Sequence, residues 1–126
     1  MISLRKPSHS RIRDFLAPQS ILEVTYQGVG SNMPPAGYKI DHTRVRLGEG
    51  QAVCLAAKAA LDGWRQFDLG WVEACPADAP ILPGSQVAIV AHHLGLWWLN
   101  ACRIVSVVDE RGPIVQYGFT YATLPA

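Results

Sequence analysis

A histidine pair and three scattered cysteines are the residues of this chain that could hold a metal ion. His92 and His93 are adjacent, and adjacent side chains of a strand point to opposite faces, so both imidazoles can reach one ion only at a turn or a bulge. Cys54, Cys75 and Cys102 form no Cys-x-x-Cys pair and show no ligand spacing with the histidines. The pattern favours polar residues near a hairpin end, and we expect neither a metal nor a cofactor.

Three basic side chains alternate with other residues in the segment 42–46. In an extended strand, His42, Arg44 and Arg46 would lie on the same face as Ile40. Turned inward, this face could bind the carboxylate or phosphate head group of an amphipathic ligand, because arginine forms paired hydrogen bonds with such groups. Turned outward, it would be a solvated surface, as is usual for unpaired arginine. The sequence leaves both orientations open and favours the outward one.

Two further motifs resemble nucleotide-binding or catalytic sequences but lack required features. Gly48-Glu49-Gly50 precedes a helix-favouring stretch, but Val53 stands in place of the third glycine of a dinucleotide-binding loop and no Lys-Ser/Thr pair follows. A tight corner before the helix explains both glycines. Asp109 and Glu110 fall in a predicted turn, where acidic residues are common. Catalysis by this pair would need burial and a raised pKa, which the sequence does not show.

The composition indicates one domain with a high apolar content. The chain has 126 residues, which suits a single domain spanning 1–126. Hydrophobic residues make up 49% and charged residues 17%, so the chain is more apolar than a typical soluble domain. The excess apolar surface could fill a core, line a cavity or form an interface. A net charge of +1 gives no support to nucleic-acid binding, and we predict no nucleic-acid partner.

The cysteine content and the apolar segments bear on the compartment of the protein. An odd number of scattered cysteines does not suit a disulfide framework and is typical of a reducing environment. The N-terminal residues are basic but show no apolar segment or cleavage site of a signal peptide. The most apolar window, 87–101, is shorter than the roughly 20 residues that a membrane helix needs. We therefore predict a cytoplasmic protein without a membrane span.

The spacing of apolar residues predicts an α+β fold. Ser8 and Ser10 are N-cap candidates for a short helix that Pro18 ends. A long, alanine-rich amphipathic helix is predicted over 51–67. Strands are predicted over 21–27, 40–47, 69–74, 87–93, 96–108 and 114–123. Because the later strands follow one another through short turns, the sheet should be antiparallel and curved, with the long helix covering one face.

Four sets of residues occur in an order and at spacings that are typical of a known family. The sets are Val29-Gly30 with Pro35-Ala36-Gly37-Tyr38; Leu47-Gly48-x-Gly50 with Ala57, Ala60, Leu61 and Trp64; Trp71; and Cys102-Arg103-Ile104 through Asp109-Glu110 with Gly118-Phe119-x-Tyr121-x-Thr123-Leu124-Pro125. Together they cover nearly the whole chain. On these motifs the chain resembles an uncharacterised domain-of-unknown-function family of bacteria and plants. That family is placed with the helix-grip superfamily of START-like and birch-pollen-allergen-like proteins.

The resemblance implies a fold in which a C-terminal helix roofs a hydrophobic cavity on the concave face of a curved sheet. In the family the chain continues after the Thr-Leu-Pro motif, whereas this sequence ends at Ala126, so it resembles a C-terminally truncated member. Tyr117, Phe119 and Tyr121 would share one bulky face of the last strand. Leaving that face bare would cost several kcal/mol, at ~25 cal/mol per Å² of apolar surface. We therefore expect a ligand or another subunit to cover it.

Three functions are compatible with this interpretation. The first is a non-catalytic binding module that holds a hydrophobic small molecule or lipid on the concave face of the sheet. The second is an enzyme of hydrolase or cyclase type on the same scaffold, which would need a polar cluster in the cavity. The third is a homodimer that uses the open sheet as its interface. We assign no catalytic residue, and the predicted ligand-binding residues are Trp64, Trp71, Tyr117, Phe119, Tyr121, His42, Arg44 and Arg46.

Overall fold

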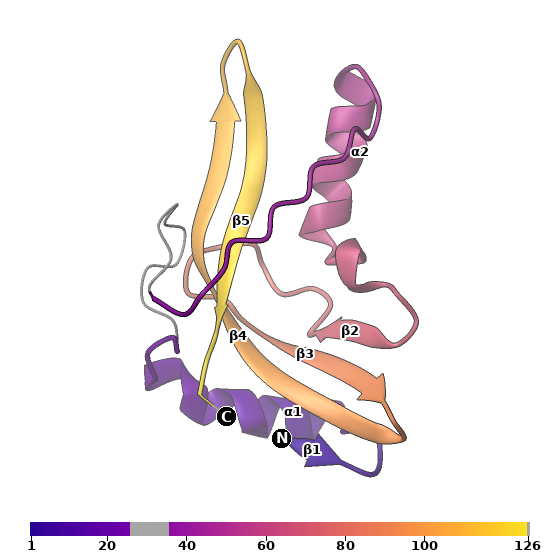
Figure 1. The fold of residues 1–126 in the computed structure, drawn as a ribbon, viewed down its shortest axis with the longest axis vertical. Coiled ribbons are helices and arrows are strands. Elements are labelled where there is room, and N and C mark those ends of the chain that lie inside the picture. The colour runs from indigo at the N-terminus through magenta and orange to yellow at the C-terminus, as the bar shows by residue number, and fades with distance from the viewer. Residues whose placement is uncertain (26–35, 126) are drawn as a thin grey trace.

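The computed structural model of the chain describes residues 1–25 and 36–125 and shows a curved antiparallel sheet with two α-helices (Figure 1). The strands of this described part are β1 (Ile2–Ser3), β2 (Val72–Cys75), β3 (Gln86–His93), β4 (Leu96–Arg111) and β5 (Val115–Thr123). The helices are α1 (His9–Leu16) and α2 (Gln51–Asp62), with 3-10 turns η1 (Ala17–Ile21) and η2 (Arg65–Phe67). The predicted α+β class with a curved antiparallel sheet, one long helix and a short N-terminal helix is confirmed.

The long strand β4 organises the sheet, because its two halves pair with different strands. Its first half pairs with β3 from Leu96 to Arg103, and its second half pairs with β5 from Cys102 to Arg111. The register shifts between Ile104 and Ser106, which indicates a β-bulge, and bulges bend and twist the strand that carries them. Beyond this point β4 and β5 continue as a two-stranded ribbon that extends away from β3 (Figure 1).

The first hydrophobic cluster lies under α1. Ser8 caps this helix, since its hydroxyl accepts a hydrogen bond from the Arg11 N–H at 3.3 Å. Ile12 and Leu16 are buried one turn apart on the face that meets the sheet. The members of this cluster are Ile12, Leu16, Cys75, Ala88, Val90, Leu99, Ala101 and Leu124. Both the helix and its serine cap were predicted correctly.

The second hydrophobic cluster lies where α2 and η2 meet the sheet. Trp64 is its largest member and is only 2% exposed. Gly63 and Trp64 end α2 before the predicted limit at residue 67, because Trp64 takes a left-handed conformation with φ of 56°. That turn directs the indole toward Val87, Cys102 and Ile104, which are buried in the same cluster. The end of the helix thus depends on a tertiary contact.

Two predicted strands are absent from the described residues. Residues 38–48 form no helix or strand, so the strand predicted over 40–47 is wrong. All of these side chains are exposed, and each face of the predicted strand mixed apolar with charged residues, so neither face could be buried. The strand predicted over 21–27 is also wrong over its described residues 21–25; residues 26–27 lie outside the described part, as do residues 29–35 of the first family motif.

The first residue of the strand predicted over 21–27 belongs instead to η1, Ala17–Ile21. The Arg103 guanidinium donates hydrogen bonds to the carbonyls of Gln19 and Ser20 in this turn at 2.8 and 3.2 Å. Thr25 then donates its N–H to the Thr123 carbonyl at 2.9 Å. The sequence analysis also missed β1, whose two residues pair with Trp97 and Trp98 of β4; an element this short shows no periodicity.

Candidate functional site

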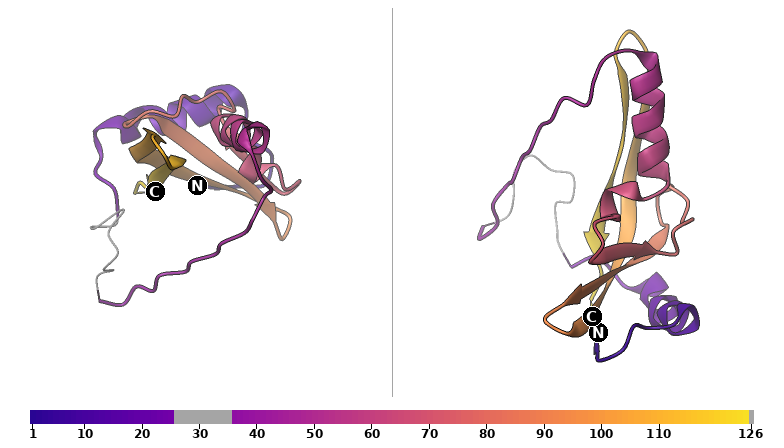
Figure 2. Two further views of the ribbon diagram at one scale, coloured as in Figure 1. Left: turned by 90° about the horizontal axis from the view of Figure 1, so that it is seen from above. Right: turned by 90° about the vertical axis from the view of Figure 1, so that its right-hand side faces the viewer.

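Helix α2 and strand β5 run side by side, and their facing side chains form a regular series of contacts. Phe119 meets Trp64 edge-to-face, with ring centroids 5.2 Å apart. Phe67 meets Tyr121 in the same way at 6.1 Å. Figure 1 and the right-hand view of Figure 2 both show α2 alongside the β4–β5 ribbon. The bulky face of the last strand is therefore turned toward α2 and η2, which cover part of it.

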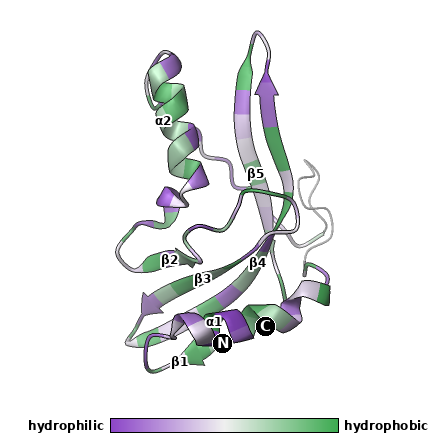
Figure 3. Cartoon of the chain, turned by 180° about the vertical axis from the view of Figure 1, so that it is seen from behind, coloured by the Kyte–Doolittle hydropathy of each residue, from purple (hydrophilic) through white to green (hydrophobic). Residues whose placement is uncertain are grey.

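A groove of about 760 Å³ opens between the N-terminal half of α2 and the outer part of the ribbon. Its walls are formed by Gly50, Gln51, Cys54, Leu55, Lys58, Asp109, Arg111, Val115 and Tyr117. Leu55 is 58% exposed and Val115 is 56% exposed. None of the twelve residues of α2 is fully buried, and Figure 3 shows hydrophobic residues along much of this helix. The groove is thus a largely apolar surface that residues 1–25 and 36–125 leave uncovered.

The inner end of the groove carries a polar cluster. Lys58 forms an ion pair with Asp62 at 3.2 Å, one helical turn away. Its ammonium also lies 4.4 Å from the centre of the Tyr117 ring, a cation–π contact. The Tyr117 hydroxyl donates a hydrogen bond to the other carboxylate oxygen of Asp62. These contacts tie α2 to β5 and place a neutral phenol, a cation and a carboxylate at one point.

The protonation of Tyr117 limits what this cluster can do. Burial, together with the hydrogen bond to Asp62 and the negative charge of Asp109, raises the pKa of Tyr117 to about 12. At neutral pH the phenol is therefore a hydrogen-bond donor and not a base. A group that serves as a general base works best with a pKa near the operating pH, so this geometry suits ligand orientation better than proton abstraction.

Tyr117 is expected to ionise only at a pH well above the usual value for tyrosine, because its pKa is raised to about 12. Because its pKa in the folded chain exceeds the value of about 10 in an unfolded chain, its contribution to stability is present below pH 10 and is lost as the pH rises through about 12. Stopped-flow tyrosinate absorbance after pH jumps measures this ionisation before the chain unfolds. The absorbance phase with a midpoint near pH 12 should disappear in Tyr117→Phe; persistence of this phase in the variant would contradict the assignment.

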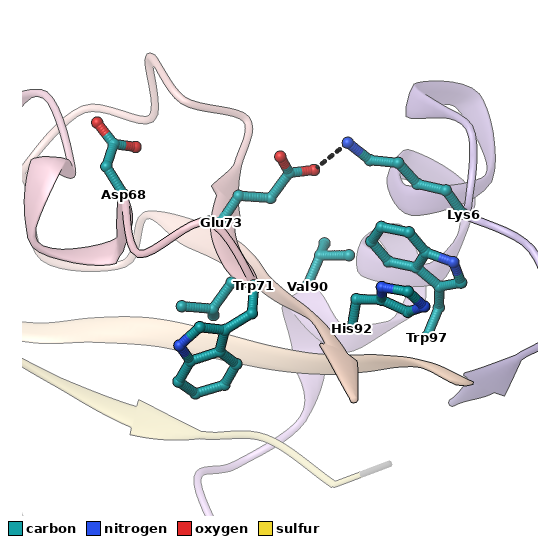
Figure 4. A pocket seen from close by; sticks show the side chains of 9 residues that line it. Lys6, Asp68, Trp71, Glu73, Val90, His92 and Trp97 are labelled. Carbon is teal, nitrogen blue, oxygen red and sulfur yellow. Dashed lines mark ion pairs between the residues drawn. The ribbon is translucent and has the colours of Figure 1, made fainter. Parts of the chain in front are cut away.

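Trp71, which the sequence analysis placed with the other aromatic residues, lies in a separate pocket of about 310 Å³ (Figure 4). The indole is 55% exposed. On the other side of the pocket, His92 and Trp97 are stacked with ring centroids 4.3 Å apart. Lys6 and Glu73 form an ion pair of 2.8 Å at its rim. The structure therefore does not bring Trp71 to the groove beside α2.

The three basic residues of the segment 42–46 also lie outside that groove. Arg44 and Arg46 line a third hollow of about 450 Å³, on a side of α2 that includes Val53 and Ala57. Arg46 forms an ion pair with the neighbouring Glu49. His42 is exposed and lines none of these three hollows. All three side chains are exposed to solvent, as the favoured outward interpretation expects. Their role in ligand binding stays a prediction.

The eight predicted ligand-binding residues thus divide among different environments. Tyr117 lines the groove, and Phe119 and Tyr121 continue the same face of β5 toward η2. Trp64 is buried, and its indole Nε1 donates a hydrogen bond to the Ala79 carbonyl at 2.9 Å, so it supports the groove from below and offers a ligand little surface. No binding measurement bears on these assignments, which stay predictions.

The sequence analysis missed most residues that line the groove. Leu55, Lys58, Asp109, Arg111 and Val115 were not proposed as ligand contacts, although all five line it. A partial signal was available, because Lys58 and Asp62 stand at i and i+4 on a predicted helix. Their meeting with Tyr117 depends on the packing of α2 against β5, which no local pattern specifies.

Metal binding and thiol chemistry find little support in the described residues. Within 1–25 and 36–125, no group of three or more His, Cys, Asp or Glu side chains is placed to hold a metal ion. Burial raises the pKa of the Cys102 thiol to about 11, and it raises that of Cys75 as well. A raised pKa keeps a thiol protonated and weakly nucleophilic. Among the same residues, no helix is long and apolar enough to cross a bilayer.

The sequence matches the profile of a family described as a domain of unknown function, DUF1990, over residues 25–126. The chain belongs to this family. Relatives of the DUF1990 chain include UPF0548 proteins of Dictyostelium discoideum, 28% identical over 98% of this chain, and of Deinococcus radiodurans, 32% identical over 99% of it. A UPF0548 protein of Arabidopsis thaliana is 29% identical over 75% of this chain. No solved structure shows significant similarity to it.

This DUF1990 chain spans only part of the length of these relatives. Its matches cover 64% of the Dictyostelium protein, 68% of the Deinococcus protein and 47% of the Arabidopsis protein. The resemblance to an uncharacterised family, inferred from the motifs above, is confirmed. The expectation that the chain is truncated, its placement in the helix-grip superfamily and its cytoplasmic location stay predictions.

Proposed function

We propose that this chain is a non-catalytic binding module that holds a hydrophobic small molecule or lipid in the groove between α2 and the β4–β5 ribbon. The observation that carries the proposal is the groove itself, with a volume of about 760 Å³ and two apolar residues, Leu55 and Val115, each more than half exposed on its walls. Small-molecule sites are typically concave, roughly 300–1,000 Å³ in volume and mainly apolar, with a few polar groups that orient the ligand.

The energetics of apolar burial support a ligand of moderate size. Removing about 300 Å² of apolar surface from water contributes roughly 7 kcal/mol at ~25 cal/mol per Å². Part of this is lost to the translational and rotational freedom that the ligand gives up. The balance is smaller than the roughly 8 kcal/mol to which micromolar binding corresponds, so we expect a dissociation constant above the micromolar range. Polar side chains that line the groove, among them Lys58, Arg111 and Tyr117, are available to orient such a ligand.

Placement in the helix-grip superfamily belongs to the same proposal. A curved antiparallel sheet with a helix beside its bulky face supports it. In the longer relatives, residues beyond those matched by this chain are available to cover such a groove. The binding role is favoured over a hydrolase or cyclase because the phenol of Tyr117, protonated at neutral pH, suits ligand orientation better than proton abstraction.

The test is direct binding of an uncharged hydrophobic probe to the native chain. N-phenylnaphthylamine should increase its fluorescence to saturation, and a long-chain alcohol should displace it. Native mass spectrometry of freshly purified protein should show retained small molecules. Light scattering on the same sample reports whether the groove is instead occupied by a second copy of the chain. Absence of saturable probe binding by a folded monomer would overturn the proposal.

A further inference from the structure

We propose that the groove selects a single-chain amphiphile with an anionic head, a carboxylate or a phosphate, and that Arg111 binds this head. The inference rests on the proposed function and adds the class of ligand. It is carried by the position of Arg111 at the outer end of the groove, by its weak pairing within the chain and by the apolar walls that lead inward from it.

The strand register gives the groove a direction. Arg111 lies opposite Val115, and Asp109 lies opposite Tyr117, so these four side chains share one face of the ribbon. Beyond Tyr117, that face continues into the contact between Phe119 and Trp64, which closes the inner end. The outer end adjoins the turn between β4 and β5, where the Arg111 side chain is 78% exposed. The head of the ligand therefore lies beside Arg111, and its hydrocarbon chain lies along Val115 and Leu55.

The charges on the groove favour an anionic head over a cationic one. The ionisable side chains that line it are Lys58, Arg111, Asp109, Tyr117 and the thiol of Cys54. Tyr117 is uncharged at neutral pH, which leaves two cations and one carboxylate facing the ligand. Lys58 is already satisfied, since it pairs with Asp62 at 3.2 Å and lies against the Tyr117 ring. Arg111 is the cation that remains available at the open end.

The contact of Arg111 with Asp109 is weak enough to be shared with a ligand. Its Nε lies 3.5 Å from the Asp109 carboxylate, and the Arg111 side chain is 78% exposed. An exposed ion pair of this kind contributes little to stability, because solvent screens it. A guanidinium carries five N–H donors, so donors remain for a bidentate contact with a carboxylate or a phosphate oxygen pair. The negative charge of Asp109 stays nearby and repels a bound anion, so replacing Asp109 with a neutral residue tests whether the anion binds here.

Displacement of N-phenylnaphthylamine by ligands with the same twelve-carbon chain tests the inference, with all ligands kept below their micelle concentrations. Dodecanoate and dodecyl phosphate are expected to bind about five- to tenfold more tightly than dodecanol, since a hydrogen-bonded charge contributes more than a neutral contact. Dodecylamine should bind more weakly than dodecanol. A preference for only one of the two anions identifies the head group and agrees with the proposal.

Two substitutions should then act in opposite directions. Arg111→Gln should remove the advantage of the anions and leave dodecanol binding unchanged. Asp109→Asn should increase the anion advantage, because it removes the opposing charge. Arg65→Gln is the matched control: Arg65 is 71% exposed in a similar pair with Asp68 at 3.0 Å, but it does not line the groove. This variant should bind every ligand as the native chain does.

The outcomes separate this inference from the proposed function. If dodecanol and the anions bind equally well, or if Arg111→Gln weakens all ligands alike, the anionic selectivity is refuted while hydrophobic binding stands. If neither dodecanol nor the anions bind and the probe shows no saturation, the proposed function fails and the inference fails with it. Tighter binding of dodecylamine than of dodecanoate would also refute the assignment of Arg111.

Discussion

Replacing Trp64 with alanine is expected to destabilise the folded chain by about 3–5 kcal/mol, the usual range for removing a buried tryptophan. Trp64 is 2% exposed and packs against Val87 and Ile104 in the second core cluster. Its loss also leaves the Ala79 carbonyl without the indole hydrogen bond of 2.9 Å and removes the ring against which Phe119 packs. A domain of this size has a total stability of roughly 5–15 kcal/mol, so the variant should be close to unfolding.

Urea denaturation followed by far-UV circular dichroism measures this change, with Trp71→Ala as the matched control. Trp71 is 55% exposed, so its removal should alter the free energy of unfolding by less than about 1 kcal/mol. Part of the cost in Trp64→Ala is offset by a smaller side chain, because a left-handed φ of 56° is unfavourable for bulky residues. Similar midpoints for the two variants would show that Trp64 does not anchor α2 to the sheet.

Replacing Leu55 with glutamine is expected to weaken binding of uncharged hydrophobic ligands by about tenfold or more. A buried leucine contributes roughly 1.5–3 kcal/mol relative to an exposed one, and much of this would be lost when the ligand covers a polar amide instead. Leu55 is 58% exposed in the ligand-free chain, and leucine and glutamine have similar helix propensities. The stability of the chain should therefore change little, and titration with N-phenylnaphthylamine reports binding alone.

Leu82→Gln provides the control for that measurement. Leu82 is 59% exposed, almost the same fraction as Leu55, but it lies between β2 and β3 and does not line the groove. It should leave the dissociation constant unchanged. Equal weakening by both variants would indicate nonspecific adsorption of the probe to exposed apolar residues, and an unchanged constant in Leu55→Gln would place the ligand elsewhere.

The sequence specified the features that depend on neighbours along the chain. Ser8 and the apolar stripe of α1 were recognised because a helix cap and a helix face are defined within one or two turns. The β3–β4 turn at Leu94-Gly95 and the strands around it followed from β-forming residues and a glycine with positive φ. The alternation of β5 correctly grouped Tyr117, Phe119 and Tyr121 on the face that meets α2 and η2.

Strand prediction from local pattern was wrong where a segment had the composition of a strand but pairs with no other strand. The segment 40–47 contains β-forming residues, yet it pairs with nothing in the described part of the chain. A strand is stabilised by its ladder and by burial of one face, and neither can be read from eight residues alone. The strand predicted over 21–27 failed at its first residue, Ile21, because this residue belongs to a 3-10 turn that hydrogen bonds from Arg103, more than eighty positions away, help to hold.

Some features of the candidate site follow from local sequence pattern, and others follow only from tertiary packing. Sequence alternation determined which side chains of β5 point toward α2, because successive strand residues must face opposite ways. Only the tertiary structure decided that Leu55 and Lys58 stand opposite Val115 and Tyr117, and that Trp71 and the arginines of 42–46 lie elsewhere. The β-bulge between Ile104 and Ser106 and the left-handed turn at Trp64 set the paths of the ribbon and the helix. Their positions follow from packing between residues distant in sequence, which is why the groove between them could not be located from the sequence alone.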